Sequence, residues 1–343
     1  MKESKIKKKN IFLKKIFLKL SRLLGYEVMD QSDLSLIGSE EKNSNSSLSQ
    51  LGVNSLTLPM GTVSITRPVK SLDIILRTCA SVKMLTQSKE RIFEKEKGEY
   101  TLRCLKSIVN SINYSENELK KIKIKFTIID FKSDQTIIDK FENILNNNFF
   151  SYEIKKLEYE KYSAQISGTN EENKPVTHNQ KSNMSNIHQS VELSKNCDDL
   201  IYFVEDDYLH SKNSILELIS AYEKFASQLN TEVFLCPTDY PYLYRDVENT
   251  NVLIGNQSHW RRINQTLCTF LTSRMMIDKY HKSITQMCKF EHYPFEKPLH
   301  DIYKKEFCFS PIPSLAIHCT NINSIYGLSP NVDIKKIWED AAF

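Results

Sequence analysis

The chain lacks several features that would place it in a familiar class of protein. Its 343 residues contain no run of about 18 uncharged apolar residues, which excludes a membrane-spanning helix. Its eight cysteines form no CxxC pair and no visible zinc-ligand cluster, so we expect buried thiols in a reducing compartment. The GxxxxGKS/T and GxGxxG patterns are also absent, which excludes the P-loop and dinucleotide fingerprints.

The composition is that of a globular protein, with 40% hydrophobic and 26% charged residues. The charge is unevenly distributed. Residues 1–26 hold nine basic residues and one acid, a net charge of +8, whereas the remaining 37 basic and 41 acidic residues give −4. A mildly acidic body argues against a nucleic acid partner.

The N-terminal segment has the pattern of a basic amphipathic helix. Apolar residues recur at helical spacing over 10–24, and lysine and arginine occupy the positions between them. Such a helix suits an anionic membrane surface, although it could also pack on the body. We therefore divide the chain into a basic helix (1–26), a polar linker (27–66) and a main domain (67–343). We expect a cytoplasmic protein, peripheral at the inner face of the membrane.

From Pro68 onward, short apolar strands alternate with amphipathic helices. Strands are expected near 72–76, 122–128, 149–154, 200–204 and 233–235, and helices near 102–112, 137–145, 184–195 and 213–228. This alternation predicts an α/β fold with a mostly parallel mixed sheet flanked by helices. In such sheets, ligands bind at the carboxyl ends of the strands.

Polar side chains follow three of the predicted strands. Glu205-Asp206-Asp207 comes directly after the apolar strand 200–204, and three adjacent carboxylates repel one another. A divalent cation, Mg²⁺ or Mn²⁺, would offset that repulsion, whereas a solvated acidic turn would need no ligand. Arg77-Thr78 and Asp130 follow the first two strands and could hold a phosphate and a nucleoside.

These residues together resemble a GT-A fold glycosyltransferase of the family 2 type, over about residues 70–320. The resemblance rests on Ile74 to Thr78, on Thr127 to Asp130 and on Asp199 to Tyr208. It implies a Rossmann-like half that binds a nucleotide-sugar donor and an acidic motif that holds a metal and the diphosphate. The first carboxylate of that motif is here Glu205, which departs from the usual aspartate.

The resemblance also implies roles for individual residues. Asp207 would be a direct metal ligand, Glu205 or Asp206 would reach the ribose or a water, and the late histidine His318 would be a second metal ligand. Asp301 precedes an amphipathic segment, where inverting members carry their general base. It could equally be a helix N-cap, and Glu296 is the reserve candidate for the base.

We therefore expect an inverting, metal-dependent glycosyltransferase of polysaccharide biosynthesis. Arg77, Thr78 and Asp130 would hold the nucleotide, and the acceptor would be a glycan or a lipid-linked or protein-linked hydroxyl. Two alternatives remain. One is a nucleotidyltransferase, which usually carries a glycine-rich loop where this chain has Cys79-Ala80. The other is a non-catalytic sugar-binding or scaffold protein.

Overall fold

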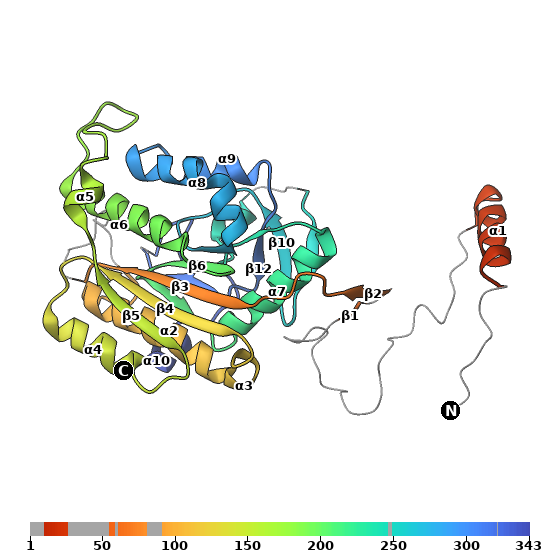
Figure 1. Cartoon of the computed structure of the whole chain (residues 1–343), viewed down its shortest axis with the longest axis horizontal. Coiled ribbons are helices and arrows are strands. Elements are labelled where there is room, and N and C mark those ends of the chain that lie inside the picture. Colours follow the sequence, from red (N-terminus) through yellow and green to blue (C-terminus); the bar gives the residue numbers. More distant parts are fainter. Residues whose placement is uncertain (1–9, 27–54, 59–60, 81–90, 246–248, 321) are drawn as a thin grey trace.

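The computed structural model describes residues 10–26, 55–58, 61–80, 91–245, 249–320 and 322–343. A nine-stranded sheet runs through the described main domain in the order β5-β4-β3-β6-β11-β8-β12-β10-β9 (Figure 1). Its strands are β3 (Ser71–Thr78), β4 (Lys123–Asp130), β5 (Ser151–Lys156), β6 (Leu200–Glu205), β8 (Phe234–Leu235), β9 (Val252–Ile254), β10 (His259–Ile263), β11 (Phe270–Ser273) and β12 (Cys308–Ile312).

The sheet has a parallel half and a mixed half. The pairs β5–β4, β4–β3 and β3–β6 are all parallel. In the other half, β11 is antiparallel to β6 and β8, and β10 is antiparallel to β12 and β9. The expected α/β fold with a mostly parallel mixed sheet is confirmed.

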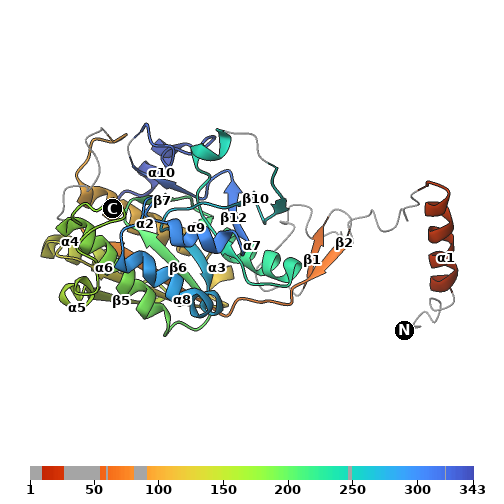
Figure 2. The same ribbon diagram turned by 90° about the horizontal axis from the view of Figure 1, so that it is seen from above.

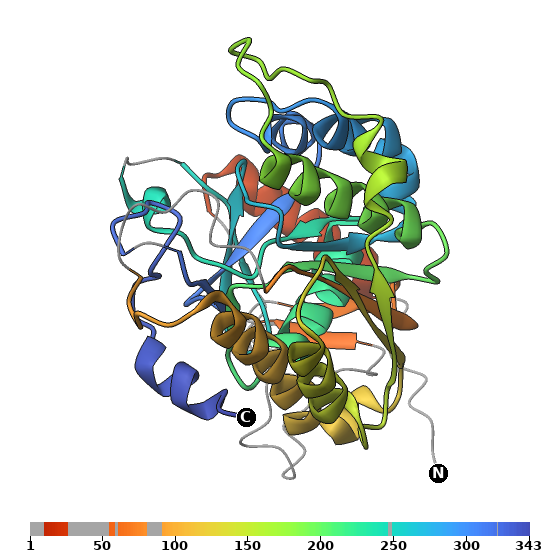
Figure 3. The same ribbon diagram turned by 90° about the vertical axis from the view of Figure 1, so that its left-hand side faces the viewer.

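Helices cover both faces of this sheet (Figure 3). The strands carry alternate side chains to opposite faces, as period-2 geometry requires. In β6, Leu200, Tyr202 and Val204 join one hydrophobic cluster, whereas Ile201 and Phe203 join the other. The first cluster is covered by α2 (Lys97–Tyr114), α4 (Gln135–Leu145) and α7 (Ser214–Leu229), and the second by α6 (His178–Ser194), α8 (Arg274–Lys289) and α9 (Lys297–Tyr303).

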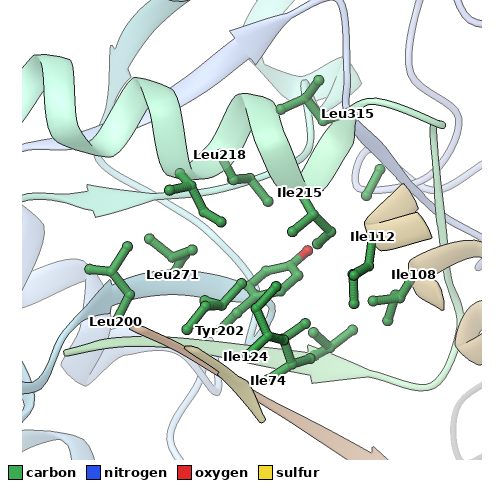
Figure 4. Packing of buried hydrophobic residues seen from close by; sticks show 14 of the residues in the cluster. Ile74, Ile108, Ile112, Ile124, Leu200, Tyr202, Ile215, Leu218, Leu271 and Leu315 are labelled. Carbon is green, nitrogen blue, oxygen red and sulfur yellow. The ribbon is translucent and has the colours of Figure 1, made fainter. Parts of the chain in front are cut away.

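Figure 4 shows the first cluster at close range. Ile74 and Tyr202 project from the sheet between Ile108 of α2 and Leu218 of α7, and none of the four is more than 1% exposed. Burying each such side chain contributes roughly 1.5–3 kcal/mol. Seven of the eight cysteines are likewise buried, and Cys79 is partly exposed.

The segments before the main domain agree only in part with the sequence. Helix α1 (Asn10–Leu23) lies where the amphipathic pattern predicts it. The expected linker contains an antiparallel hairpin, β1 (Ser55–Leu58) and β2 (Gly61–Ser64), and residues 27–54 and 59–60 lie outside the described residues. In the described part of the chain, every helix is too short or too polar to span a bilayer.

A small second sheet adjoins the main one. Its two strands, β7 (Tyr208–His210) and β13 (Ala316–His318), are antiparallel and set His318 opposite Tyr208. Helix α10 (Ile334–Asp340) packs against α2 and β7 (Figure 2). The remaining short elements are α3 (Glu116–Leu119), α5 (Tyr159–Ser163) and the 3₁₀ helix η2 (Pro241–Tyr244).

Candidate functional site

The parallel register brings the three predicted strand ends to one edge of the sheet. Thr78 of β3 lies opposite Asp130 of β4, and Arg77 lies opposite Glu205 of β6. The Nη2 of Arg77 is 3.1 Å from the Oε1 of Glu205, and its Nη1 donates to the Oδ1 of Asn183 at 3.0 Å. The guanidinium is therefore fixed beside the first carboxylate of the triplet.

Asp130 is held within the fold by neighbouring donors. Its Oδ1 accepts hydrogen bonds from the Oγ1 of Thr78 at 2.7 Å and from the Oγ of Ser133 at 2.6 Å. Its Oδ2 accepts from the backbone N–H of Ser133 at 2.9 Å. Thr78 and Asp130 thus shape the end of β4, and their expected contacts with a nucleotide stay a prediction.

Asp206 is also held from within the fold. Its Oδ2 accepts from the backbone N–H of Cys79 at 3.1 Å and from the Oγ1 of Thr101 at 3.0 Å. The Nζ of Lys97, at the start of α2, lies 3.5 Å from the same oxygen. This buried carboxylate therefore ties the end of β3 and the start of α2 to the acidic motif.

Asp207 and His318 lie next to each other because β7 and β13 are paired. The carbonyl of Asp207 accepts from the backbone N–H of Cys319 at 2.8 Å, and the His318 Nε2 is 3.4 Å from the Asp207 Oδ2. The Arg91 Nη2 is 3.3 Å from that same oxygen. Burial alone would raise the pKa of Asp207, but the charges of His318, Arg91 and Lys97 hold that pKa well below its usual range.

The positive charge expected beside the triplet comes at least partly from the chain itself. Arg77 pairs with Glu205, Lys97 with Asp206, and Arg91 with Asp207. Repulsion among the three carboxylates is therefore no argument for a bound cation. Within the described ranges, no group of three or more His, Cys, Asp or Glu side chains is placed to hold a metal ion.

Asp207 and His318 nevertheless fit two positions of a metal site. The Nδ1 of His318 lies 3.0 Å from the carbonyl oxygen of Tyr326, which can only accept, so the Nδ1 must carry a proton. That bond leaves the Nε2 as the ring atom that faces Asp207 and could bind a metal. A cation held by one carboxylate and one imidazole would take its other ligands from phosphate oxygens and water.

The structure places Asp301 at an exposed position within helix α9. Helix α9 begins at Lys297, so Asp301 lies in its middle and not at its start as expected, and it cannot be the N-cap. Its exposed carboxylate pairs with Lys304 at 2.5 Å, and this pair lowers the pKa of Asp301. It lines a pocket of about 250 Å³ between α8 and α9, which no residue of the acidic triplet lines.

The reserve candidate, Glu296, occupies the N-cap position of α9 and lies close enough to the acidic cluster to interact electrostatically with Glu205 and His318. Burial and then the charge of Glu205 raise the pKa of Glu296 to about 7, against the opposing charges of His318 and Arg77. A carboxylate with such a pKa is well matched to proton transfer near neutral pH. Arg91 and Lys97 complete the site. Sequence reasoning missed both, because neither follows a predicted strand.

Comparison with known proteins returns only distant structural similarity. No family model and no curated protein matches the sequence. Similar solved structures include the galactosyltransferase LgtC in complex with donor and acceptor sugar analogs, at 10% identity and a TM-score of 0.34, covering 68% of this chain and 66% of LgtC. S. aureus TarS follows at 15% identity and a TM-score of 0.32, covering 62% of this chain and 30% of TarS.

A UDP-glucose pyrophosphorylase complexed with UDP-glucose is also similar, at 6% identity and a TM-score of 0.39, over 80% of this chain and 97% of that one. The chain thus spans about two thirds of LgtC and under a third of TarS. Function is therefore inferred from the site. Membership of family 2 stays a prediction.

Proposed function

We propose that the protein is a glycosyltransferase that moves a sugar from a nucleotide-sugar donor to an acceptor hydroxyl. The observation that carries this proposal is the convergence of Asp207, His318 and three cationic side chains at the carboxyl edge of the parallel strands. Arg77, Arg91 and Lys97 would face the donor's diphosphate, and Glu205 and Asp206 would hold their orientation.

A divalent cation, Mn²⁺ or Mg²⁺, is proposed between Asp207, His318 and the diphosphate. When bound, it would act as a Lewis acid that offsets the charge developing on the leaving group. His318 would turn its Nε2 toward that ion, because the carbonyl of Tyr326 holds the proton of its Nδ1.

Glu296 is proposed as the general base in place of Asp301. Its carboxylate would take the proton of the acceptor hydroxyl while that oxygen attacks the anomeric carbon and the bond to the diphosphate breaks. A single displacement of this kind inverts the anomeric configuration. The raised pKa of Glu296, which follows from burial and from Glu205, suits a base that works near neutral pH.

We propose an anionic membrane surface as a further partner, through α1. Five apolar residues of its segment are more than 40% exposed, namely Ile16, Phe17, Leu20, Leu23 and Leu24. Basic residues lie between them in the sequence, which is the pattern that binds anionic headgroups. The acceptor would then be a glycan or a lipid-linked hydroxyl at the inner face of the membrane.

The decisive test of the donor site is Asp207→Ala, with Asp198→Ala as its matched control. Asp198 is an exposed aspartate paired with Lys123 near the opposite end of β6. Calorimetry with UDP, GDP and CDP in the presence of Mn²⁺ should show at least about 100-fold weaker binding for Asp207→Ala only. Equal affinity in the two variants would refute the metal assignment.

Product analysis separates the two enzyme classes. The proposed reaction releases a nucleoside diphosphate from a nucleotide sugar, whereas a nucleotidyltransferase releases pyrophosphate from a nucleoside triphosphate and a sugar phosphate. Pyrophosphate release would favour the second class.

For α1, Phe17→Ser with Leu20→Ser in the full chain should abolish pelleting on anionic vesicles, and unchanged pelleting would remove the membrane proposal.

A further inference from the structure

The loop between α5 and α6, residues 164–177, lies against the segment that connects α8 to α9 and carries Glu296 (Figure 3). Hydrogen bonds within the loop give it a shape of its own. The backbone N–H of Asn170 donates to the carbonyl of Lys174 at 2.9 Å, and the Oδ1 of Asn170 accepts from the backbone N–H of Lys174 at 2.9 Å. The loop is therefore a defined structure that can support what it touches.

Backbone bonds and an apolar contact join this loop to the segment between α8 and α9. The backbone N–H of Ser167 donates to the carbonyl of Lys289 at 2.8 Å, and that of Glu171 donates to the carbonyl of Glu291 at 3.1 Å. Next to these bonds, the Phe295 ring packs against buried apolar side chains of the loop and of α6, namely Ile166, Val176 and Met184. The segment is therefore held by its backbone and by one large side chain.

The side chain of Glu171 adds a bridge across the same segment. Its Oε2 accepts from the backbone N–H of Tyr293 at 2.8 Å, and its Oε1 accepts from the Nζ of Lys297 at 2.6 Å. Hydrogen bonds to an ionised carboxylate are among the stronger ones in proteins. Tyr293 lies three residues before Glu296 and Lys297 lies one residue after it, so one carboxylate holds both flanks of the proposed base.

The carboxylate of Glu296 has little support of its own. Among the described residues, the one side-chain donor to it is the thiol of Cys268, whose Sγ is 3.9 Å from the Oε1 of Glu296, and a thiol is a weak donor. The place of this carboxylate therefore depends on the backbone that carries it. A displacement of about 1 Å in a reacting group can cost about 10²-fold in rate.

We propose that Glu171 is a positioning residue for sugar transfer, which bridges Tyr293 and Lys297 and thereby sets the place of the Glu296 carboxylate. This inference rests on the proposed function, in which Glu296 is the general base. The side chains of Glu171 and Lys297 are 36% and 47% exposed, so their ion pair should add little to the stability of the whole fold. Its effect is expected on the segment and not on folding.

The test compares three single variants of the full chain. Glu171→Ala removes both contacts, whereas Glu171→Gln keeps an oxygen that can accept from the N–H of Tyr293. The matched control is Glu172→Ala, the neighbouring carboxylate, which pairs with Lys174. The rate is hydrolysis of UDP-glucose, UDP-galactose or GDP-mannose, whichever the wild type cleaves fastest, with water in place of the acceptor hydroxyl.

We expect kcat to fall about tenfold in Glu171→Ala, about threefold in Glu171→Gln and less than about twofold in Glu172→Ala. The KM for the donor should stay within about twofold in all three, because the donor site is untouched. Hydrogen exchange of the Tyr293 amide should be about tenfold faster in Glu171→Ala than in the wild type or in Glu172→Ala.

The double variant Glu171→Ala with Glu296→Gln distinguishes positioning from general support. If Glu171 acts through Glu296, its removal should cost less than about twofold once Glu296 is glutamine, whereas a general structural role would cost the same tenfold in both backgrounds. That second result would overturn the inference, and so would an unchanged kcat in Glu171→Ala or an equal loss in Glu172→Ala.

Failure of the proposed function looks different, because the wild type would then hydrolyse none of the three donors. Faster exchange of the Tyr293 amide in Glu171→Ala would in that case still show that Glu171 holds the segment. Unchanged exchange would refute the bridge itself.

Discussion

The parallel half and the mixed half of the sheet differ in what their polar side chains contact. At the ends of β3, β4 and β6, the polar side chains bind one another. Thr78 and Ser133 donate to Asp130, and Thr101 and Lys97 face Asp206. In the mixed half, the polar groups beyond β10 line an open pocket.

This difference suits the two regions to different tasks. Groups that pair with one another are preorganised, so they could orient a phosphate at little cost in entropy. Groups that line a hollow are placed to meet a ligand, and they can change without disturbing the parallel strands. Glu296 lies where the two regions meet, because it belongs to α9 and its pKa responds to Glu205 of β6.

The largest expected effect comes from Glu296→Gln, which removes the proposed general base. Loss of the base should lower kcat for sugar transfer by about 10²–10³-fold, while nucleotide binding stays nearly unchanged. The matched control is Asp301→Asn on the same helix, whose exposed carboxylate pairs with Lys304. We expect it to change kcat by less than about threefold. A larger loss in Asp301→Asn than in Glu296→Gln would return the role of base to Asp301.

The pH dependence sharpens the same comparison. A general base acts in its deprotonated form, so transfer should rise with pH up to about 7, the pKa of Glu296, and level off above it. The charge of Lys304 lowers the pKa of Asp301, so a site based on Asp301 would already be active at acidic pH. A kcat/KM profile from pH 5 to 9, which reports the free enzyme, would count against Glu296 if its slope did not change near pH 7.

The parallel half could be predicted from the sequence, and the reasons are physical. Strands buried on both faces appear as continuous apolar runs, as in Leu200 to Val204, and each is followed by its helix. Parallel pairing then sends all carboxyl ends to one edge, which is why Arg77, Asp130 and Glu205 could be expected together.

The mixed half gave weaker signals. Strand β8 has two residues and β13 has three, too few to show a period. The start of α9 was misplaced because Asp301 is a good N-cap residue, whereas the helix begins four residues earlier with proline in its first turn. Arg91 reaches Asp207 only through tertiary packing, which no local pattern encodes.

Substitution of Trp338 tests how that packing supports the donor side. Trp338 of α10 stacks on Phe93 with centroids 4.1 Å apart and lies 5.0 Å from Tyr100, whose ring is 4.6 Å below the guanidinium of Arg91. Trp338→Ala should lower the free energy of unfolding by about 3 kcal/mol and weaken nucleotide binding. Trp338→Phe should restore most of both. Urea unfolding would measure the stability and calorimetry the nucleotide affinity. Unchanged nucleotide affinity in Trp338→Ala would show that α10 does not support the donor site.

The smallest expected effect distinguishes scaffold from ligand contact at the end of β4. Ser133→Ala removes one of three hydrogen bonds to Asp130 and also the acceptor of the Ala80 backbone N–H at 3.0 Å, so the free energy of unfolding should fall by about 1–2 kcal/mol. Nucleotide affinity should stay within about twofold, because Thr78 and the backbone of residue 133 still hold the carboxylate. Ser283→Ala, at an exposed position of α8, is the control and should change stability by less than about 0.5 kcal/mol. If Ser133→Ala instead weakened nucleotide binding more than fivefold at unchanged stability, Asp130 would contact the donor directly. The polar groups of the parallel half would then bind the donor as well as one another.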